Sequence, residues 1–144
     1  MFYRQKSYKI KMEFVENFND LFNKINLPNQ LKHGSNLVGR WMKPKASSKD
    51  TDIIEIFAIW QYNSYEEYLE IETKIQNDKA HIKHINDWYE QNGGREYVLK
   101  EYILEIRNEF IESTLKNNNI GSGANRGYIP KNNEDSYRNR SLRC

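Results

Sequence analysis

The sequence has almost no cysteine and no long apolar segment, and these absences exclude several classes of protein. Cys144 is its single cysteine, so neither a disulfide framework nor a cysteine-based metal cluster can form within one chain. No apolar run approaches the roughly 18 residues of a membrane-spanning helix. The first residues (MFYRQK) are charged at once, unlike a signal peptide. We therefore expect a cytoplasmic protein that does not associate with membranes.

Motifs for nucleotide binding and for hydrolases are also missing. The chain contains no glycine-rich phosphate loop, no Gly-x-Ser-x-Gly and no His-Glu-x-x-His pattern. Nucleotide-dependent chemistry therefore has no support.

The net charge of +2 is unevenly distributed along the chain. Residues 116–144 hold six of the 22 Lys/Arg and two of the 20 Asp/Glu, which leaves a net charge of −2 for residues 1–115. The basic character therefore belongs to the C-terminal segment.

Residues 116–144 are rich in Asn, Gly, Ser and Arg and follow neither a strand nor a helix period. Such a composition buries too little apolar area to offset its ordering entropy, so it predicts a disordered basic tail after a folded domain at 1–115. A weak RNA or membrane-surface contact is the alternative to a solvated extension. Short basic tails carry little specificity, so we expect no nucleic-acid partner.

The remaining residues carry an aromatic share of 13%, enough bulk for one core, and their periodicity predicts helices and strands. The first half is expected to contain a strand at 2–11 and a helix at 12–26. Pro28 either ends that helix or starts a second, short one at 28–33, which Gly34 caps. Strands at 36–43 and 52–62, joined by a turn at 44–51, are expected to follow. The second half is expected to begin with a helix that the capping box Ser64 to Glu67 opens. This helix is interrupted at Asn77-Asp78 and ends at Gly93-Gly94. A strand at 96–107 and one helical turn within 108–115 are expected to follow.

The order β-α-β-β-α-β predicts an α+β, ferredoxin-like fold, in which a four-stranded antiparallel sheet carries two helices on one face. Both parities of the segments 52–62 and 96–107 are largely apolar, whereas two helices cover only one face of a sheet. The second face then needs a cover, and a second copy of the chain is the simplest one. We therefore expect a homodimer that packs sheet against sheet, as a dimeric α+β barrel.

Two neighbouring segments resemble the central signature of the NIPSNAP family. Residues 37–41 read Leu-Val-Gly-Arg-Trp, and residues 60–64 read Trp-Gln-Tyr-Asn-Ser at the start of the expected second helix. The order of elements extends the resemblance over residues 2–107. The resemblance implies a dimeric α+β barrel, that is, a homodimer enclosing a cavity between two sheets, but it implies no settled reaction.

One parity of the strands is predicted to line this cavity between the sheets, because a ligand cavity tolerates ionisable groups better than a helix-covered face does. Its expected residues are Arg40, Glu55, Phe57, Ile59 and Lys100. The opposite parity, with Trp60, is expected to pack under the helices, and Trp60 becomes the cavity residue if the parities are exchanged. Tyr102 is a further candidate, in an aromatic cavity wall with Trp41 and Phe57.

Glu55 is the candidate catalytic residue. In an apolar cavity its pKa would rise, and it would act as a general base. The alternative, which we favour, is an ion pair with Arg40 or Lys100 across the sheet.

His81 and His84 are weak candidates for metal or haem, since they lie three residues apart on a predicted helix. Haem-degrading relatives of the resembled family use an Asn on the first strand, and residues 2–11 contain none. We therefore expect neither a metal nor a cofactor.

The sequence thus predicts a protein that binds a small hydrophobic or aromatic molecule between its sheets, with no assigned activity. A cofactor-independent monooxygenase and a protein-interaction module remain as alternatives.

Overall fold

The computed structural model describes residues 1–43 and 52–115. The expected turn at 44–51 and the expected disordered tail at 116–144 lie outside the described residues. No helix within the described ranges is long and apolar enough to cross a membrane.

Four strands form one antiparallel sheet in the order β2-β3-β1-β4. Their bounds are β1 Phe2–Lys11, β2 Asn36–Met42, β3 Ile53–Tyr62 and β4 Ile103–Ile111. The chain consists of two consecutive β-α-β units. The two central strands of the sheet, β1 from the first unit and β3 from the second, pair along ten residues. This is the predicted ferredoxin-like arrangement.

Four helical segments follow β1 without a break in helical backbone: η1 Met12–Phe14, α1 Val15–Leu21, η2 Phe22–Asn26 and α2 Leu27–Lys32. Phe14, Phe18 and Leu21 are buried, as their helical spacing predicts. Pro28 lies in the first turn of α2, where its missing N–H is tolerated. Gly34 ends this stretch with a φ of 100°, a conformation that favours glycine.

The second helical stretch begins and restarts at side-chain caps, as expected. Helix α3 spans Tyr65–Gln76 and α4 spans Lys79–Gln91. The Ser64 hydroxyl accepts a hydrogen bond from the Glu67 backbone N–H at 3.1 Å, and the Asp78 carboxylate accepts one from the His81 N–H at the same distance. Each cap satisfies a backbone donor that the first helical turn leaves free.

The predictions for residues 96–107 and 108–115 are wrong in part. Helix α5 occupies Arg95–Glu101, strand β4 starts only at Ile103, and it continues to Ile111 where a helical turn was expected. Val98 and Tyr102 lie four residues apart, which satisfies a helical spacing as well as an alternating one, so the local pattern was ambiguous. Packing decides the outcome, because Val98 is fully buried in the core between helix and sheet.

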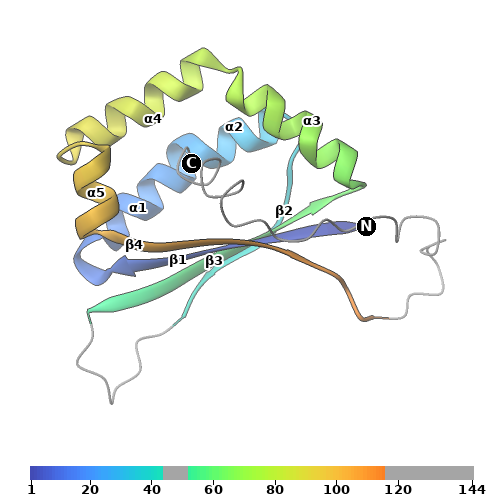
Figure 1. Ribbon diagram of the computed structural model, residues 1–144, viewed down its shortest axis with the longest axis horizontal. Helices are drawn as coiled ribbons and strands as arrows, with labels where there is room; N and C mark the ends of the chain where they lie inside the picture. Colours follow the sequence, from blue (N-terminus) through green and yellow to red (C-terminus); the bar gives the residue numbers. More distant parts are fainter. Residues whose placement is uncertain (44–51, 116–144) are drawn as a thin grey trace.

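Helices α1, α2, α3 and α4 lie over one face of the sheet (Figure 1). We call this the covered face; it carries the even-numbered residues of β1 and β3. The opposite face, which we call the open face, carries the odd-numbered residues of these strands, and no described helix packs on it. Every even-numbered residue of β3 is buried and every odd-numbered one is at least partly exposed.

Candidate functional site

A cavity of about 20 Å³ lies between the sheet and the helices, counted as the space open to the centre of a water molecule. One water needs roughly 10–15 Å³ by that measure, so the cavity exceeds a single water site. Its lining comes from β1, β2 and β3 below and from α1, η2 and α2 above: Arg4, Lys6, Tyr8, Phe18, Phe22, Asn26, Gln30, Arg40, Ala58 and Trp60. The lining thus combines three cations and four aromatic rings with no carboxylate.

The cations reach the covered face through the strand register. Ala58 of β3 pairs with Lys6 of β1 on one side and with Arg40 of β2 on the other. Cross-strand partners point to the same face, so Lys6 and Arg40 flank the small Ala58 side chain. A methyl group between two long cationic side chains leaves the space that becomes the cavity.

Arg40 occupies the covered face because β2 contains a bulge. The pairing of β2 with β3 shifts between Leu37 and Gly39, so Val38 is an extra residue, and Leu37 and Arg40 both end on the covered face. Arg40 Nη1 donates a hydrogen bond to Asn19 Oδ1 at 2.8 Å, and its guanidinium carbon lies 4.3 Å from the ring centroid of Phe22. Burial lowers the pKa of Arg40, against a smaller opposite effect of Tyr8.

Arg40 and Asn26, which both line the cavity, each carry a buried polar atom that remains unsatisfied. Arg40 Nη2 has no hydrogen-bond partner among the residues that the structure describes, and neither does Asn26 Oδ1. Asn26 is 9% exposed. Unsatisfied buried polar atoms are rare in folded proteins and require an explanation, and water or a ligand commonly supplies it.

Arg4 lies one position further along the covered face and is 2% exposed. Its Nη1 lies 3.4 Å from Glu72 Oε1 on α3, and its Nη2 donates a hydrogen bond to the Tyr62 hydroxyl at 3.0 Å. The Glu72 carboxylate is thus the counter-charge of Arg4, whereas no carboxylate belongs to the lining of the cavity itself.

Arg40 and Trp60 are the two predicted site residues that line this cavity. For Trp60 the expected packing under the helices is confirmed, since it is 3% exposed on the covered face. For Arg40 the predicted face is wrong, because its neighbour Ala58 faces the helices.

Arg4 and Lys6 line the cavity and were missed. The signal was present: both share the parity of Phe2, Tyr8 and Ile10, and a charged side chain on an apolar parity of a strand marks a buried polar site.

Glu55 lies on the open face in an ion-pair network. Lys43 Nζ is 2.8 Å from Glu55 Oε2, and Arg107 Nη2 is 3.2 Å from Oε1. The hydrogen bond from Lys43 holds the pKa of Glu55 below its usual value. The favoured expectation, an ion pair, is met with Lys43 and Arg107 in place of Arg40 and Lys100. The lowered pKa contradicts the other expectation, a general base whose pKa is raised by burial.

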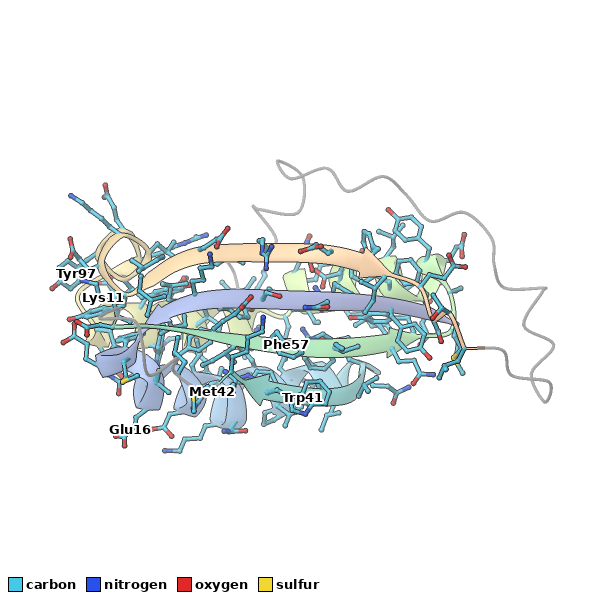
Figure 2. All side chains as sticks on the ribbon, turned by 90° about the horizontal axis from the view of Figure 1, so that it is seen from below. Lys11, Glu16, Trp41, Met42, Phe57 and Tyr97 are labelled. Carbon is cyan, nitrogen blue, oxygen red and sulfur yellow. The ribbon has the colours of Figure 1, made fainter. Side chains whose placement is uncertain are left out.

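The other predicted cavity residues do not meet. Phe57 and Ile59 share the open face, where the Phe57 ring lies 5.4 Å from that of Trp41 (Figure 2). Lys100 is exposed on α5 rather than on a strand. Tyr102 follows α5 and stacks on Phe14 with a centroid separation of 4.4 Å, so the expected wall of Tyr102, Trp41 and Phe57 is not formed.

His81 and His84 diverge on α4, because His81 is buried and His84 is exposed. Burial lowers the pKa of His81, which disfavours its protonated form. The described part of the chain contains no group of three or more His, Cys, Asp or Glu residues that could hold a metal ion.

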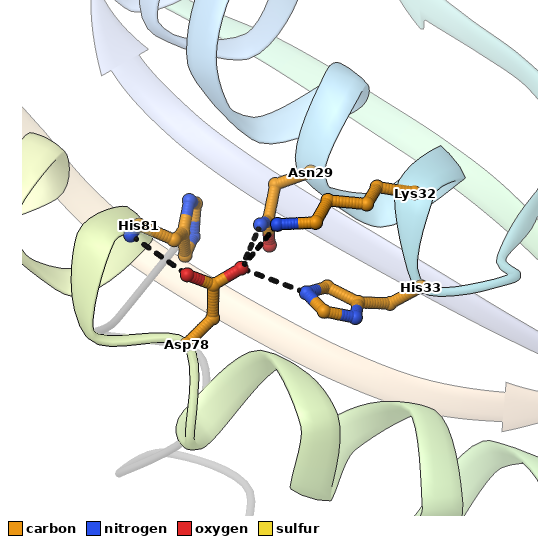
Figure 3. A network of polar contacts seen from close by, with 5 residues as sticks. All are labelled: Asn29, Lys32, His33, Asp78 and His81. Atoms are coloured by element: carbon orange, nitrogen blue, oxygen red, sulfur yellow. Dashed lines mark hydrogen bonds and ion pairs between the residues drawn. The ribbon is translucent and has the colours of Figure 1, made fainter.

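A second polar cluster joins α2 to the start of α4 (Figure 3). Asp78 Oδ2 accepts hydrogen bonds from Asn29 Nδ2 at 3.0 Å and from Lys32 Nζ at 3.2 Å, and it lies 2.8 Å from His33 Nε2. These contacts, His33 first, hold the pKa of Asp78 far below its usual value. The cluster connects the helical stretch after β1 to the one that contains α4, and none of its residues lines the cavity.

Comparison with solved structures places this architecture among known folds. A NIPSNAP family protein from Agrobacterium tumefaciens superposes with a TM-score of 0.57 at 16% sequence identity, over 78% of this chain and 92% of that one. A NIPSNAP domain protein from Burkholderia xenovorans gives a TM-score of 0.53 at 17% identity, over 78% and 94%. The chain has a NIPSNAP-like fold.

A further NIPSNAP-like domain protein from Burkholderia xenovorans matches with a TM-score of 0.55 at 12% identity, over 81% of this chain and 88% of that one. No family model and no curated protein matches the sequence. Likeness at these identities concerns the NIPSNAP-like backbone alone. Any activity has to be argued from the cavity.

Proposed function

We propose that this NIPSNAP-like protein binds a small organic molecule with an aromatic or apolar body. The site is the cavity between sheet and helices, not the space between two sheets. The observation that carries the proposal is the cavity lining, where Tyr8, Phe18, Phe22 and Trp60 surround unsatisfied polar atoms. Ligand sites typically combine such an apolar wall with a few convergent polar groups.

The cavity is small in this side-chain arrangement, and its lining residues differ in how deeply they are buried. Phe22 and Arg40 are only partly buried, whereas Lys6, Ala58 and Trp60 are buried. A group of a few atoms would therefore occupy the buried part of the cavity. The rest of the ligand would extend outward past the Phe22 side chain or displace that side chain. Movement of side chains on ligand binding is common even where the backbone stays still.

We also propose that the protein is a homodimer through the open face. Trp41 is 46% exposed and lies beside Phe57 on β2 and β3. The β1 and β4 part of the same face carries the ion pairs Lys9–Glu105 and Arg107–Glu109. A second copy would cover the apolar half and place its charged half at the rim. A cytoplasmic location stays a prediction.

The binding proposal is tested with phenol, benzamide and benzoate, which share one ring and differ in the attached polar group. At least one of them is expected to raise the melting temperature of the wild-type protein, because a ligand of the folded state stabilises it by mass action. Ala58→Leu fills the cavity and is expected to abolish that shift. Ile59→Leu changes the neighbouring residue on the open face and serves as the matched control.

Circular dichroism checks that both variants fold, and Ala58→Val is the smaller substitution if Ala58→Leu does not. Absence of binding by the wild-type protein to all three compounds would overturn the proposal. Equal shifts in wild type and the folded Ala58 variant would do the same. Of the alternative functions, neither monooxygenase activity nor an interaction module is favoured by a specific contact of the described residues.

A further inference from the structure

We infer that the ligand of the cavity is an organic anion, whose carboxylate-sized head binds beside Ala58 between Arg40 and Lys6. This inference rests on the proposed function and adds the chemical class of the ligand. Its basis is the sign and the placement of the charges that surround the cavity.

The first step is the charge of the lining. Three of the ten lining residues are cationic and none is acidic. Glu72, the carboxylate that pairs with Arg4, is not part of the cavity lining. Buried charges are costly unless a counter-charge lies close to them. An anion in the cavity would supply a counter-charge to Arg40, which has no ion pair with any described residue.

The second step is the state of Arg40. Its side-chain contacts are to neutral groups, namely Asn19 and the rings of Phe18 and Phe22. Within residues 1–43 and 52–115, no carboxylate forms an ion pair with it, and its Nη2 donates no hydrogen bond. A guanidinium retains its charge even where burial disfavours it, and its planar fork matches a carboxylate.

The third step is geometry. Lys6 and Arg40 both neighbour Ala58 on the covered face, one from each adjacent strand. Lys6 is 3% exposed, and Asn26 from η2 closes the cavity from above with its own unsatisfied atom. The head of the ligand therefore meets cations from two sides and an amide from a third. The aromatic residues Phe22 and Trp60 are placed to contact an apolar body.

The experiment compares benzoate with benzamide, which has nearly the same shape and no charge. Isothermal titration calorimetry with the full-length protein is expected to give at least a tenfold lower Kd for benzoate. Acetate and inorganic phosphate test whether the anionic head alone suffices. Both are expected to bind more weakly than benzoate, because they lack the ring.

Arg40→Gln is expected to raise the Kd of benzoate at least tenfold and to leave that of benzamide within a factor of about three. Arg95→Gln removes an exposed arginine on α5 and is the matched control, with no expected change. Arg40→Lys retains the positive charge but lacks the planar guanidinium group, and it should give an intermediate Kd for benzoate. If Arg40→Gln does not fold, the benzoate and benzamide affinities of the wild-type protein decide the question.

The outcomes separate this inference from the proposed function. Equal affinity for benzoate and benzamide, with both lost in Ala58→Leu, would overturn the anion inference and leave the cavity as a binding site. Acetate or phosphate binding as tightly as benzoate would overturn the role of the organic body. Failure of all the aromatic compounds to bind would remove both proposals.

Discussion

At the scale of single residues, the covered face depends on how each buried cation is compensated. Arg4 is 2% exposed, and the side chain of its carboxylate partner Glu72 is 8% exposed. Such a pair adds little stability relative to an apolar pair, but removing one member leaves a buried charge. The pair therefore fixes where β1 and α3 meet.

We predict that Glu72→Gln lowers the free energy of unfolding by roughly 3 kcal/mol, since the buried guanidinium loses this counter-charge. Chemical denaturation at pH 7, followed by circular dichroism, measures the change. Glu70→Gln alters an exposed carboxylate on the same helix and is expected to stay within about 0.5 kcal/mol of wild type. Equal stability of the two variants would show that Arg4 does not need Glu72.

At the scale of elements, one carboxylate connects two helical stretches. Asp78 caps α4 and accepts hydrogen bonds from Asn29 and Lys32 of α2, next to His33. The folded state therefore holds Asp78 ionised more strongly than the unfolded chain does. Because the pKa is lowered on folding, the resulting stability is present above the unfolded value near 3.8 and is lost as the pH falls below it.

We predict that Asp78→Asn destabilises the protein at pH 7, while the difference from wild type shrinks at pH 3. Asn retains the capping ability, so the comparison isolates the charge of the cluster. Urea denaturation at pH 7, 5 and 3 measures it. Asp87→Asn, which removes an exposed carboxylate of α4, is the control. A difference that grows on acidification would contradict the predicted direction.

At the scale of the whole molecule, the open face is the surface on which the proposed homodimer depends. Trp41 and Phe57 on β2 and β3 form an apolar part of this face, while ion pairs occupy much of the β1 and β4 side, where Tyr3 pairs with Ile111. Both parities of the strands had appeared largely apolar in the sequence. The second apolar surface is smaller than the two apolar parities had indicated, because residues 95–101 form a helix and ion pairs lie on the open face.

We predict a homodimer at micromolar concentration, and we expect Phe57→Lys to shift it to a monomer by placing a charge in the apolar half of the interface. Light scattering coupled to gel filtration measures the mass. Leu31→Lys places the same charge at an exposed apolar position on α2 and should leave the mass unchanged. A wild-type monomer would contradict the open-face interface.

The sequence determined the elements whose signals are local. The apolar spacing of Phe14, Phe18 and Leu21, the caps at Ser64 and Asp78, and the dense apolar run of β3 each act within a few residues, and all appear in the structure. The order of these elements was then enough to predict the ferredoxin-like sheet, because short connections leave few topologies.

Only the tertiary structure decided which side chains share the cavity. The bulge at Val38 and the pairing with Ala58 place Arg40 on the covered face, and both depend on the alignment of strands far apart in the chain. The same holds for Val98, whose segment satisfied a strand and a helix pattern until packing against the core selected α5. Periodicity reports the faces of one element, whereas a site arises from the register between several of them.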